Sequence, residues 1–446
     1  MASIIAPVTA LLLSVAFMMF GHGLQTTILP IRAEFESFSN ATIGIMSSLF
    51  FLGFVLGGIL GPYLIVRAGH IRTFAALVSV WSASALLHPL VVEGATWGVA
   101  RLISGFCLAS LYLIIESWLN ERADNTTRGM VMSAYTIIVF SSIMVGQVST
   151  SILTVEGYQA FVISSILLSI AAVPVALTKS AQPAPIAVVR IRPLTLYRTS
   201  PAAIISCFVV GLGVGSLFSL LPLYASQAKV EASLIPFVAG ALMLGGLLFQ
   251  YPLGRLSDKV DRRYMLILGS IGSIAVCMFI GLGNIVDPYF LIFMVVVLGG
   301  LVQPLYSIAA AHAFDFASPD DMVETAAGVL LAYGTGSIIG PTVATTAMDI
   351  VGPGALFLSV ACSLAGLVLF LMFRITRRVT LSTEDKGDYD LASSAPIGGV
   401  LTPELYEVED EWVLVPEDYE MEETGDDEET TTEYPYSDLE EDEGTP

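Results

Sequence analysis

Residues 248–263 read Leu248-Phe-Gln-Tyr-Pro-Leu-Gly-Arg-Leu-Ser-Asp-Lys-Val-Asp-Arg-Arg263 and lie between two long apolar runs. The second part of this segment is strongly charged, with Arg255, Asp258, Lys259, Asp261, Arg262 and Arg263. A short basic loop between two hydrophobic segments is typical of the cytoplasmic face of a membrane protein. Gly254 allows helices to approach closely, and Asp258 could accept hydrogen bonds from amides at a neighbouring helix end.

A degraded copy of this segment lies earlier in the chain, at residues 61–72. It retains Arg67, Gly69 and Arg72, whereas Val66 stands where the later copy has Asp258. The two copies are about 193 residues apart (254 − 61). Two further pairs repeat at offsets of 192 and 194, namely Leu29-Pro30-Ile31 with Leu221-Pro222-Leu223, and Ser142–Gly146 with Gly336–Gly340. Three matches at nearly one offset predict two homologous halves.

The composition separates an apolar body from an acidic tail. The chain has 446 residues, 55% hydrophobic and 13% charged, which is too apolar for an ordinary soluble protein. Residues 379–446 hold 24 acidic residues and one Lys, so the other 378 residues hold 16 acids (40 − 24) and 18 Lys and Arg (19 − 1). The net charge of −21 therefore belongs to the tail, and nothing indicates nucleic-acid binding.

A helix that crosses a membrane needs about 20 mostly apolar residues. By this measure we expect twelve spans, at about 4–29, 41–65, 73–92, 97–118, 129–152, 159–178, 200–226, 234–254, 264–284, 289–312, 323–349 and 355–374. Basic residues and prolines interrupt the series at 179–199, which we interpret as a linker between six-helix halves at 1–178 and 200–374. The predicted fold class is all-α integral membrane, with two pseudo-symmetric halves.

The distribution of basic residues predicts that both termini are cytoplasmic. The loops after spans 2, 4, 6, 8 and 12 hold nearly all of them, and the opposite loops hold only Arg32 and Lys229. The acidic loop at 313–322, which contains Asp315, either has no bearing on topology or faces the basic loop of the same half. Residues 375–446 have low complexity, so we expect a disordered acidic tail that only solvates the protein or binds a cytoplasmic partner.

Several motifs of known chemistry are absent from the sequence. There is no G-x-x-x-x-G-K-[ST], no H-E-x-x-H and no cluster of Cys and His. The four cysteines, Cys107, Cys207, Cys277 and Cys362, lie far apart in apolar runs, and we interpret them as packing residues. We therefore expect neither an enzyme nor a bound cofactor or metal, and we predict that any transport is driven by a gradient.

Ionisable groups inside a membrane are costly and are therefore candidate functional residues. Arg101 lies about one turn into the fourth span, and Glu116 lies about 22 Å further along the same helix. The two are about 60° apart around the helix axis, so both could face one cavity. Glu116 could serve as a proton site, because burial disfavours its charged form, or it could pair with a nearby arginine. Arg101 could alternatively be an interfacial arginine.

The spacing G-x-L-x-D-x-x-x-R-R, at Gly254, Asp258, Arg262 and Arg263, resembles the loop signature of the major facilitator superfamily. In that superfamily the signature lies between helices two and three of each half, which implies gating loops here and in the copy that contains Arg67, Gly69 and Arg72. Asp261 stands where the family usually has glycine.

Two further patterns resemble the same superfamily. Arg101-x-x-x-Gly105 resembles a motif on helix 4 of many of its transporters, where the arginine is linked to proton coupling. The pair Glu121 and Arg128 resembles a gate element of sugar porters. The order of all these pieces over residues 5–375 resembles the uncharacterised YcaD-type bacterial branch, which implies the inner membrane but no particular substrate.

The resemblance also implies a central cavity lined by helices 1, 4, 7 and 10. The polar positions available on these helices are His22, Gln25, Thr26, Ser104, Tyr112, Ser216, Ser219, Gln303 and Tyr306. Gln303 precedes Pro304 in mid-helix, where a freed carbonyl could serve a ligand. For His22, a packing role and a proton-carrying role both remain open.

We therefore expect a monomeric secondary transporter in the lipid bilayer. It would export a small organic molecule in exchange for protons. Two alternatives remain: proton-coupled uptake, and a transport-dead sensor or scaffold that uses the acidic tail.

Overall fold

The computed structural model describes residues 8–123, 127–177, 200–283, 285, 287–317 and 322–376. The expected linker at 179–199 and the tail beyond residue 376 lie outside these residues. Within the described ranges, twelve helices are long and apolar enough to cross a membrane, which confirms the predicted fold class.

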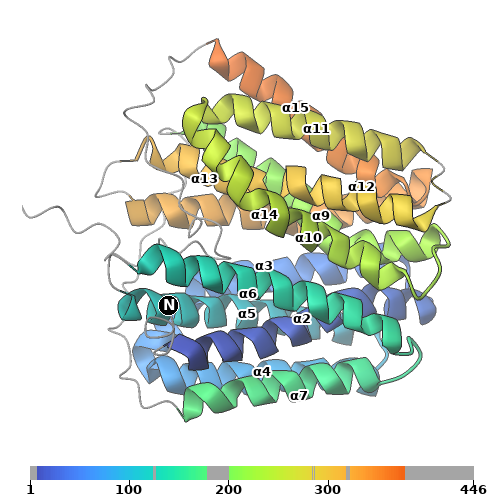
Figure 1. Ribbon diagram of the computed structural model, residues 1–446. Helices are drawn as coiled ribbons and strands as arrows, with labels where there is room; N and C mark the ends of the chain where they lie inside the picture. Colours follow the sequence, from blue (N-terminus) through green and yellow to red (C-terminus); the bar gives the residue numbers. More distant parts are fainter. Residues whose placement is uncertain are drawn as a thin grey trace, which may run out of the picture. The chain divides into compact units, whose positions relative to one another are not determined.

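The helices form two groups of six spans, which occupy the lower and upper parts of the view in Figure 1. The first group contains α2 (Thr9–Phe35), α3 (Asn40–Ala68), α4 (His70–Leu90), α5 (Gly94–Arg122), α6 (Arg128–Ser149), the 3-10 turn η2 (Thr150–Ile152) and α7 (Gln159–Ala176). The second contains α9 (Pro201–Gln227), α10 (Ile235–Lys259), α11 (Arg262–Leu282), α12 (Pro288–Val302), α13 (Pro304–Phe314), α14 (Met322–Val351) and α15 (Ala355–Ile375). The helices α12 and α13 form one span that is interrupted at Gln303.

The same helix crossings recur in both halves, and glycines make them possible. In α5, a Cβ at Gly105 would collide with the backbone carbonyl of Phe50 in α3. In α12, a Cβ at Gly299 would collide with the carbonyl of Leu242 in α10. The glycines are 194 residues apart (299 − 105) and their partners 192 (242 − 50), which matches the sequence repeat. The repeat therefore reflects backbone-to-backbone packing that only small residues allow.

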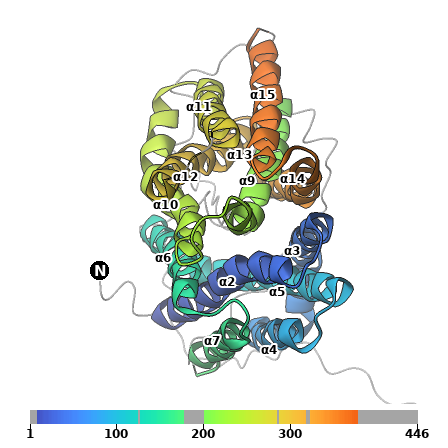
Figure 2. The same cartoon turned by 90° about the vertical axis from the view of Figure 1, so that its right-hand side faces the viewer.

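The two halves meet through α3 against α14, α6 against α10, and α2 against α9, as Figure 2 also shows. Near the start of α3, the Nδ2 of Asn40 donates to Oδ1 of Asp349 at 2.8 Å, and Nε2 of Gln227 donates to Oδ1 of Asn40 at 2.7 Å. About two turns further, the hydroxyls of Ser48 and Thr342 lie 2.8 Å apart. These bonds tie the halves together at the end of the bundle where α3 begins.

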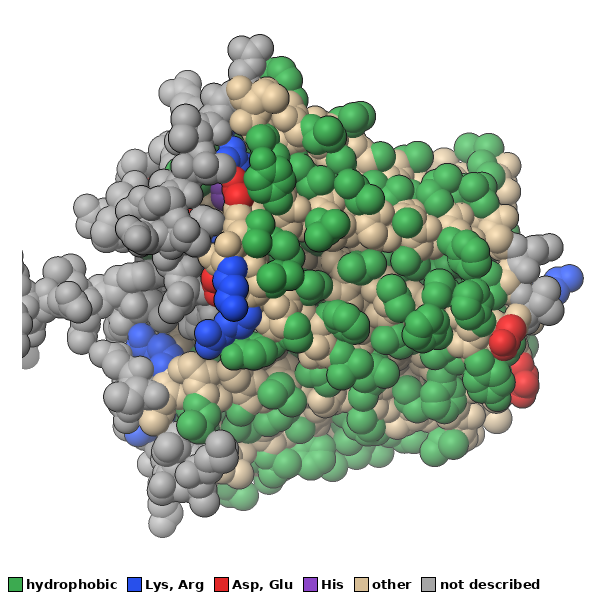
Figure 3. Space-filling model, turned by 45° about the horizontal axis from the view of Figure 1, so that its top comes forward, with side chains coloured by type: hydrophobic (Ala, Val, Ile, Leu, Met, Phe, Trp, Pro, Cys, Tyr) green, Lys and Arg blue, Asp and Glu red, His purple; other side chains and the backbone are tan. Residues whose placement is uncertain are grey.

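The opposite end of the bundle is basic. Apolar side chains cover the flank of the molecule, and most of the Lys and Arg side chains in view gather at one end (Figure 3). This basic end carries Arg67, Arg72, Arg122, Arg128, Arg255, Lys259, Arg262, Arg263 and Arg374. The apolar flank explains the hydropathy of the sequence, because it is the surface that contacts lipid tails.

Several helix ends differ from the sequence expectation, and two of these differences move candidate site residues. The fourth span begins at Gly94 rather than near residue 97, so Arg101 lies about 10 Å from the helix start, nearly two turns. The eighth span continues to Lys259, so Asp258 belongs to the last turn of α10 and not to a loop. At the end of α10, polar and charged residues extend the helix beyond its apolar core, which a hydropathy window does not detect.

Candidate functional site

A cavity of about 180 Å³ lies between the two halves, midway along the helices. We call it the central cavity. Its lining residues come from α2, α3, α5 and α6 of the first half and from the second half. The lining consists of His22, Phe50, Phe51, Phe54, Leu108, Tyr112, Val139, Phe140, Ile143, Val214, Gly215, Phe218, Met243, Gln250, Gln303, Tyr306, Ser307, Tyr333, Gly334 and Ser337. No Asp, Glu, Lys or Arg is among them.

His22 lies in a stack of rings at one side of the central cavity. Its imidazole stacks on Phe50 at a centroid distance of 5.5 Å and on Phe218 at 5.9 Å, and it meets the edge of Trp81 at 5.9 Å. Phe50 belongs to the first half and Phe218 to the second, so the stack crosses between the halves. Aromatic pairs of this kind contribute about 0.5–1.5 kcal/mol each beyond area burial.

The polar groups of the second half lie on α10, α13 and α14 and at the break between α12 and α13. Nε2 of Gln250 donates to Oγ of Ser307 at 2.5 Å. Gln303, at the break, is half-buried and lines the cavity. The rings of Tyr306 and Tyr333 pack 4.7 Å apart on the same side. The cavity therefore has a mostly aromatic wall from the first half and an amide- and hydroxyl-bearing wall from the second.

A second, smaller cavity of about 20 Å³ lies next to the central cavity, toward the end where α3 begins. The two share Phe50, Phe51 and Phe218 in their linings. This minor cavity holds Arg101, which is 6% exposed and whose guanidinium carbon lies 4.0 Å from the centroid of the Phe50 ring. Its Nη1 is buried without a hydrogen-bond partner among the described residues. Arg101 is therefore separated from the central cavity by the ring on which it stacks.

Glu116 lies beyond the other end of the central cavity on the same helix. It is 4% exposed and accepts a hydrogen bond of 3.0 Å from the Tyr135 hydroxyl of α6. One turn away, Tyr112 lines the central cavity and donates to Sδ of Met19 at 2.9 Å. Along α5, the arginine, the cavity-lining residues and the acid thus follow one another in that order.

The polar residues proposed from sequence distribute over three environments. His22, Tyr112, Gln303 and Tyr306 line the central cavity, and Gln25, Thr26 and Ser219 line the minor cavity with Arg101. Gln25 also donates to Oγ of Ser164 at 3.0 Å. Ser104 and Ser216 line neither cavity. Both donate to the carbonyl four residues earlier in their own helix, at 2.8 and 2.7 Å.

The sequence analysis did not predict the phenylalanines of the aromatic wall or Gln250 as cavity residues. Phe50, Phe51, Phe54 and Phe140 lie on α3 and α6, which are not among the four helices that the family resemblance indicated. The usable signal was the spacing of Phe50 and Phe54, four residues apart and therefore on one helix face. A helix face that contacts lipid has the same spacing of apolar residues, so periodicity cannot distinguish a lipid-facing phenylalanine from one that lines a cavity.

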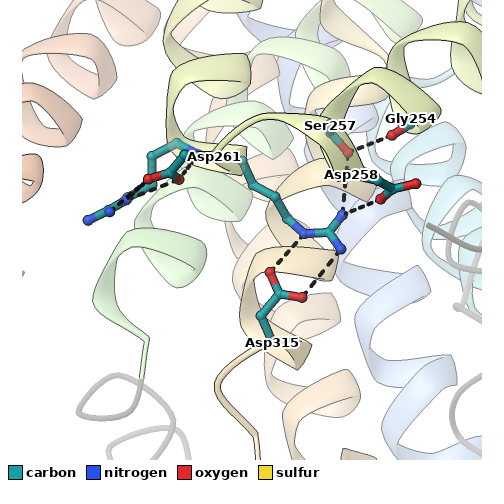
Figure 4. Close-up of polar contacts among 7 residues, drawn as sticks. Gly254, Ser257, Asp258, Asp261 and Asp315 are labelled. Carbon is teal, nitrogen blue, oxygen red and sulfur yellow. Dashed lines mark hydrogen bonds and ion pairs between the residues drawn. The ribbon is translucent and has the colours of Figure 1, made fainter. Parts of the chain in front are cut away.

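At the basic end, Arg262 of α11 contacts α10 and Asp315, the residue that follows α13 (Figure 4). Its Nε donates to Oδ2 of Asp315 at 2.8 Å and its Nη2 to Oδ1 at 3.3 Å, so the pair is bidentate. Its Nη1 lies 3.4 Å from Asp258 and 3.3 Å from the Ser257 hydroxyl. Arg262 and Asp315 are 2% and 4% exposed. The acidic loop therefore does face the basic loop, through Asp315.

Asp261 caps α11 at the position where the superfamily usually has glycine. Its carboxylate accepts from the backbone amide of Arg263 at 2.9 Å and from Nη2 of the same residue at 2.8 Å. Burial by itself would raise the pKa of Asp261, but the hydrogen bonds and charge of Arg263 outweigh burial and lower that pKa. The aspartate thus starts the helix as a conventional N-cap.

The corresponding loop of the first half is more exposed. Gly69 has φ of +79° between α3 and α4, a conformation that favours glycine, whereas Arg67 and Arg72 are exposed on either side. Glu121 is exposed near the end of α5, and Arg128 begins α6. Gly254 is buried in α10, and its carbonyl accepts from the Ser257 hydroxyl at 2.6 Å.

Comparison with known proteins agrees with the twelve-helix membrane fold described above. Residues 11–240 and 203–405 match the model of the Major Facilitator Superfamily. YcaD of Escherichia fergusonii, an uncharacterised MFS-type transporter, is 26% identical over 380 residues, which cover 84% of this chain and 97% of YcaD. An uncharacterised MFS-type transporter of Yersinia pestis is 26% identical over 377 residues, covering 82% and 95%.

Among solved structures, the nucleoside transporter NupG superposes with a TM-score of 0.68 at 15% identity, covering 83% of this chain and 99% of NupG. At that identity the likeness shows the fold. Together with the match of the family model to both halves, it identifies the chain as a member of the major facilitator superfamily, an integral membrane secondary transporter.

Proposed function

We propose that this protein exports a small organic molecule across the bacterial inner membrane in exchange for protons. The observation that carries the proposal is the order of groups on α5: a buried guanidinium at Arg101, a cavity, and a buried carboxyl at Glu116. A carboxyl that is buried within a bundle is a candidate proton carrier, because it can be neutralised where a charge is costly. The central cavity, shared by both halves, is the site for the exported molecule.

Alternating access requires that the halves separate at one end and close at the other. The bonds that Asn40 makes to Asp349 and Gln227 close the end where α3 begins. Basic residues favour the cytoplasmic side, so we assign the basic end to the cytoplasm, together with both chain termini. In this orientation the cavity lies on the cytoplasmic side of the closed end, where a molecule to be exported would enter.

Arg101 acts in this proposal as a fixed charge, since a guanidinium does not release its proton under physiological conditions. It lies about 22 Å along the helix from Glu116, which is too far for contact. When Glu116 is protonated and therefore neutral, the positive charge of Arg101 is not balanced and disfavours the binding of a cation in the central cavity. Lysine cannot replace it fully, because the planar group stacks on the Phe50 ring.

The test uses everted membrane vesicles that respiration has acidified inside, with an acridine dye reporting the pH gradient. A panel of organic compounds is added outside. Antiport of a compound releases protons from the lumen and restores dye fluorescence, whereas a symporter in this orientation gives no such response to external compound. Glu116→Gln should abolish the response, and Arg101→Lys should retain a part of it.

Matched controls separate coupling from folding. Glu93→Gln changes an exposed acid at the start of α5 and should behave as the wild type. The proposal fails if no compound restores fluorescence with the wild-type protein, or if Glu116→Gln and Arg101→Gln respond at wild-type rates.

A further inference from the structure

The lining of the central cavity specifies a class of ligand more narrowly than a small organic molecule does. We infer that the cavity binds an uncharged, planar aromatic molecule that carries one hydrogen-bonding edge, and that this edge points toward α10, α12 and α13. The inference rests on the proposed function, since it names the substrate class of the same site.

Charge is the first discriminating property. No Asp, Glu, Lys or Arg lines the central cavity, so an ion bound there would have no counter-charge in contact with it. A charge that is desolvated without a partner is strongly disfavoured. Arg101 lies behind the Phe50 ring in the minor cavity, and the Glu116 carboxylate is held by Tyr135, so neither belongs to the lining. A neutral ligand avoids this penalty.

Aromaticity is the second property. The wall from the first half presents Phe50, Phe51, Phe54, Tyr112 and Phe140, and Phe218 adds a further ring. Ring edges and faces pair favourably with an aromatic ligand at centroid distances of about 4.5–7 Å. A saturated ligand of equal size is stabilised only by the burial of its apolar surface. Several such pairs therefore favour an aromatic over a saturated ring system.

The third property is a polar edge on one side. Gln250, Gln303 and Ser307 lie on the second-half wall and bring amide and hydroxyl groups to the cavity. Nε2 of Gln303 has Sδ of Met243 as a contact at 3.9 Å, which is a weak acceptor at a long distance. A hydroxyl, amide or ring nitrogen of the ligand would be a stronger partner for this amide. The ligand is thus oriented with its polar edge toward the second half.

The four probe molecules share one fused bicyclic carbon skeleton and differ in charge or in saturation. They are 2-naphthol (neutral and flat), 2-naphthoate (an anion), 2-naphthylmethylammonium (a cation) and 2-decalol (neutral and saturated). Binding to the purified full chain in detergent at pH 7 is measured by equilibrium dialysis, with partition into empty micelles subtracted. We expect 2-naphthol to bind at least tenfold more tightly than either ion and at least fivefold more tightly than 2-decalol.

Three variants locate the binding. Gln303→Leu should weaken 2-naphthol about tenfold by removing the amide, and Tyr306→Leu should weaken it by removing a ring of the cavity. Phe293→Leu, on α12 at a side chain that is 57% exposed, should bind as the wild type. If Tyr306→Leu does not fold, Gln303→Leu alone still tests the site.

The inference is overturned if an ion or 2-decalol binds as tightly as 2-naphthol, or if Gln303→Leu leaves binding unchanged. These results need no gradient and are independent of the antiport assay. Tight binding of 2-naphthol without any proton response in vesicles would instead refute the proposed function and leave the ligand class standing.

Discussion

The buried pair of Arg262 and Asp315 yields a quantitative prediction about stability. Asp315→Asn removes the charge that faces the guanidinium but retains one amide oxygen as an acceptor. Breaking a buried ion pair by removing one partner costs about 3–5 kcal/mol, and the retained acceptor places this variant near 3 kcal/mol, or about 100-fold in an equilibrium constant. Asp258→Asn alters a partly exposed contact of 3.4 Å and should cost about 1 kcal/mol or less.

The assay measures the fraction of monodisperse protein that survives heating in detergent. We expect the midpoint of Asp315→Asn to fall clearly below that of Asp258→Asn, although both substitutions make the same chemical change. The double variant Arg262→Met, Asp315→Leu should recover much of the loss, because it leaves no lone buried charge. Equal midpoints for the two Asn variants, or a double variant less stable than Asp315→Asn, would contradict the reasoning.

Three further predictions follow from other parts of the chain. Gly105→Ala should lower the yield of folded protein, because its Cβ would meet the Phe50 carbonyl. In the control Gly366→Ala, the added Cβ meets nothing within 4 Å, so this variant should be neutral or stabilised by about 0.5–1 kcal/mol. Size-exclusion chromatography compares the two variants, and equal profiles would count against the close crossing at Gly105. Truncation after Ser382 should leave the amount of assembled membrane protein unchanged, since residues 383–446 contain no apolar run of about 20 residues. Loss of assembled protein would contradict this. The lowered pKa of Asp261 means that its stabilising contribution is fully present above the ordinary aspartate pKa of about 3.9 and is lost as the pH falls through the lower pKa of the folded state. Asp261→Asn should therefore melt below the wild type at neutral pH, and the difference should shrink as the pH is lowered below about 3.9; a difference that stays constant would be evidence against it.

The number and order of the spans could be predicted from sequence because apolar length is a direct physical requirement of the bilayer. The repeat offset was equally informative, since the repeated glycines Gly146 and Gly340 each lie at a helix crossing that a larger residue would block. The depth of Arg101 was less accessible, because α5 begins at Gly94, three residues before the expected start at 97, and a hydropathy window does not locate helix ends.

The site could be predicted only in part. Choosing polar residues on four helices found His22, Tyr112, Gln303 and Tyr306, which line the central cavity. The same choice included Ser104, which bonds within its own helix, because a hydroxyl can satisfy itself locally and sequence does not show which way it turns. The phenylalanines of α3 were not found, since an apolar ring is equally expected against lipid and against a ligand.

The backbone crossings bear on how the protein is made. Gly105 packs against α3 and Gly299 against α10, so each of these two crossings is formed by helices of one half. The helices that need one another most closely are thus synthesised near in time, and the first half can complete these contacts while the ribosome is still translating the second. A chain divided within residues 179–199 and produced as two polypeptides should therefore reassemble in the membrane.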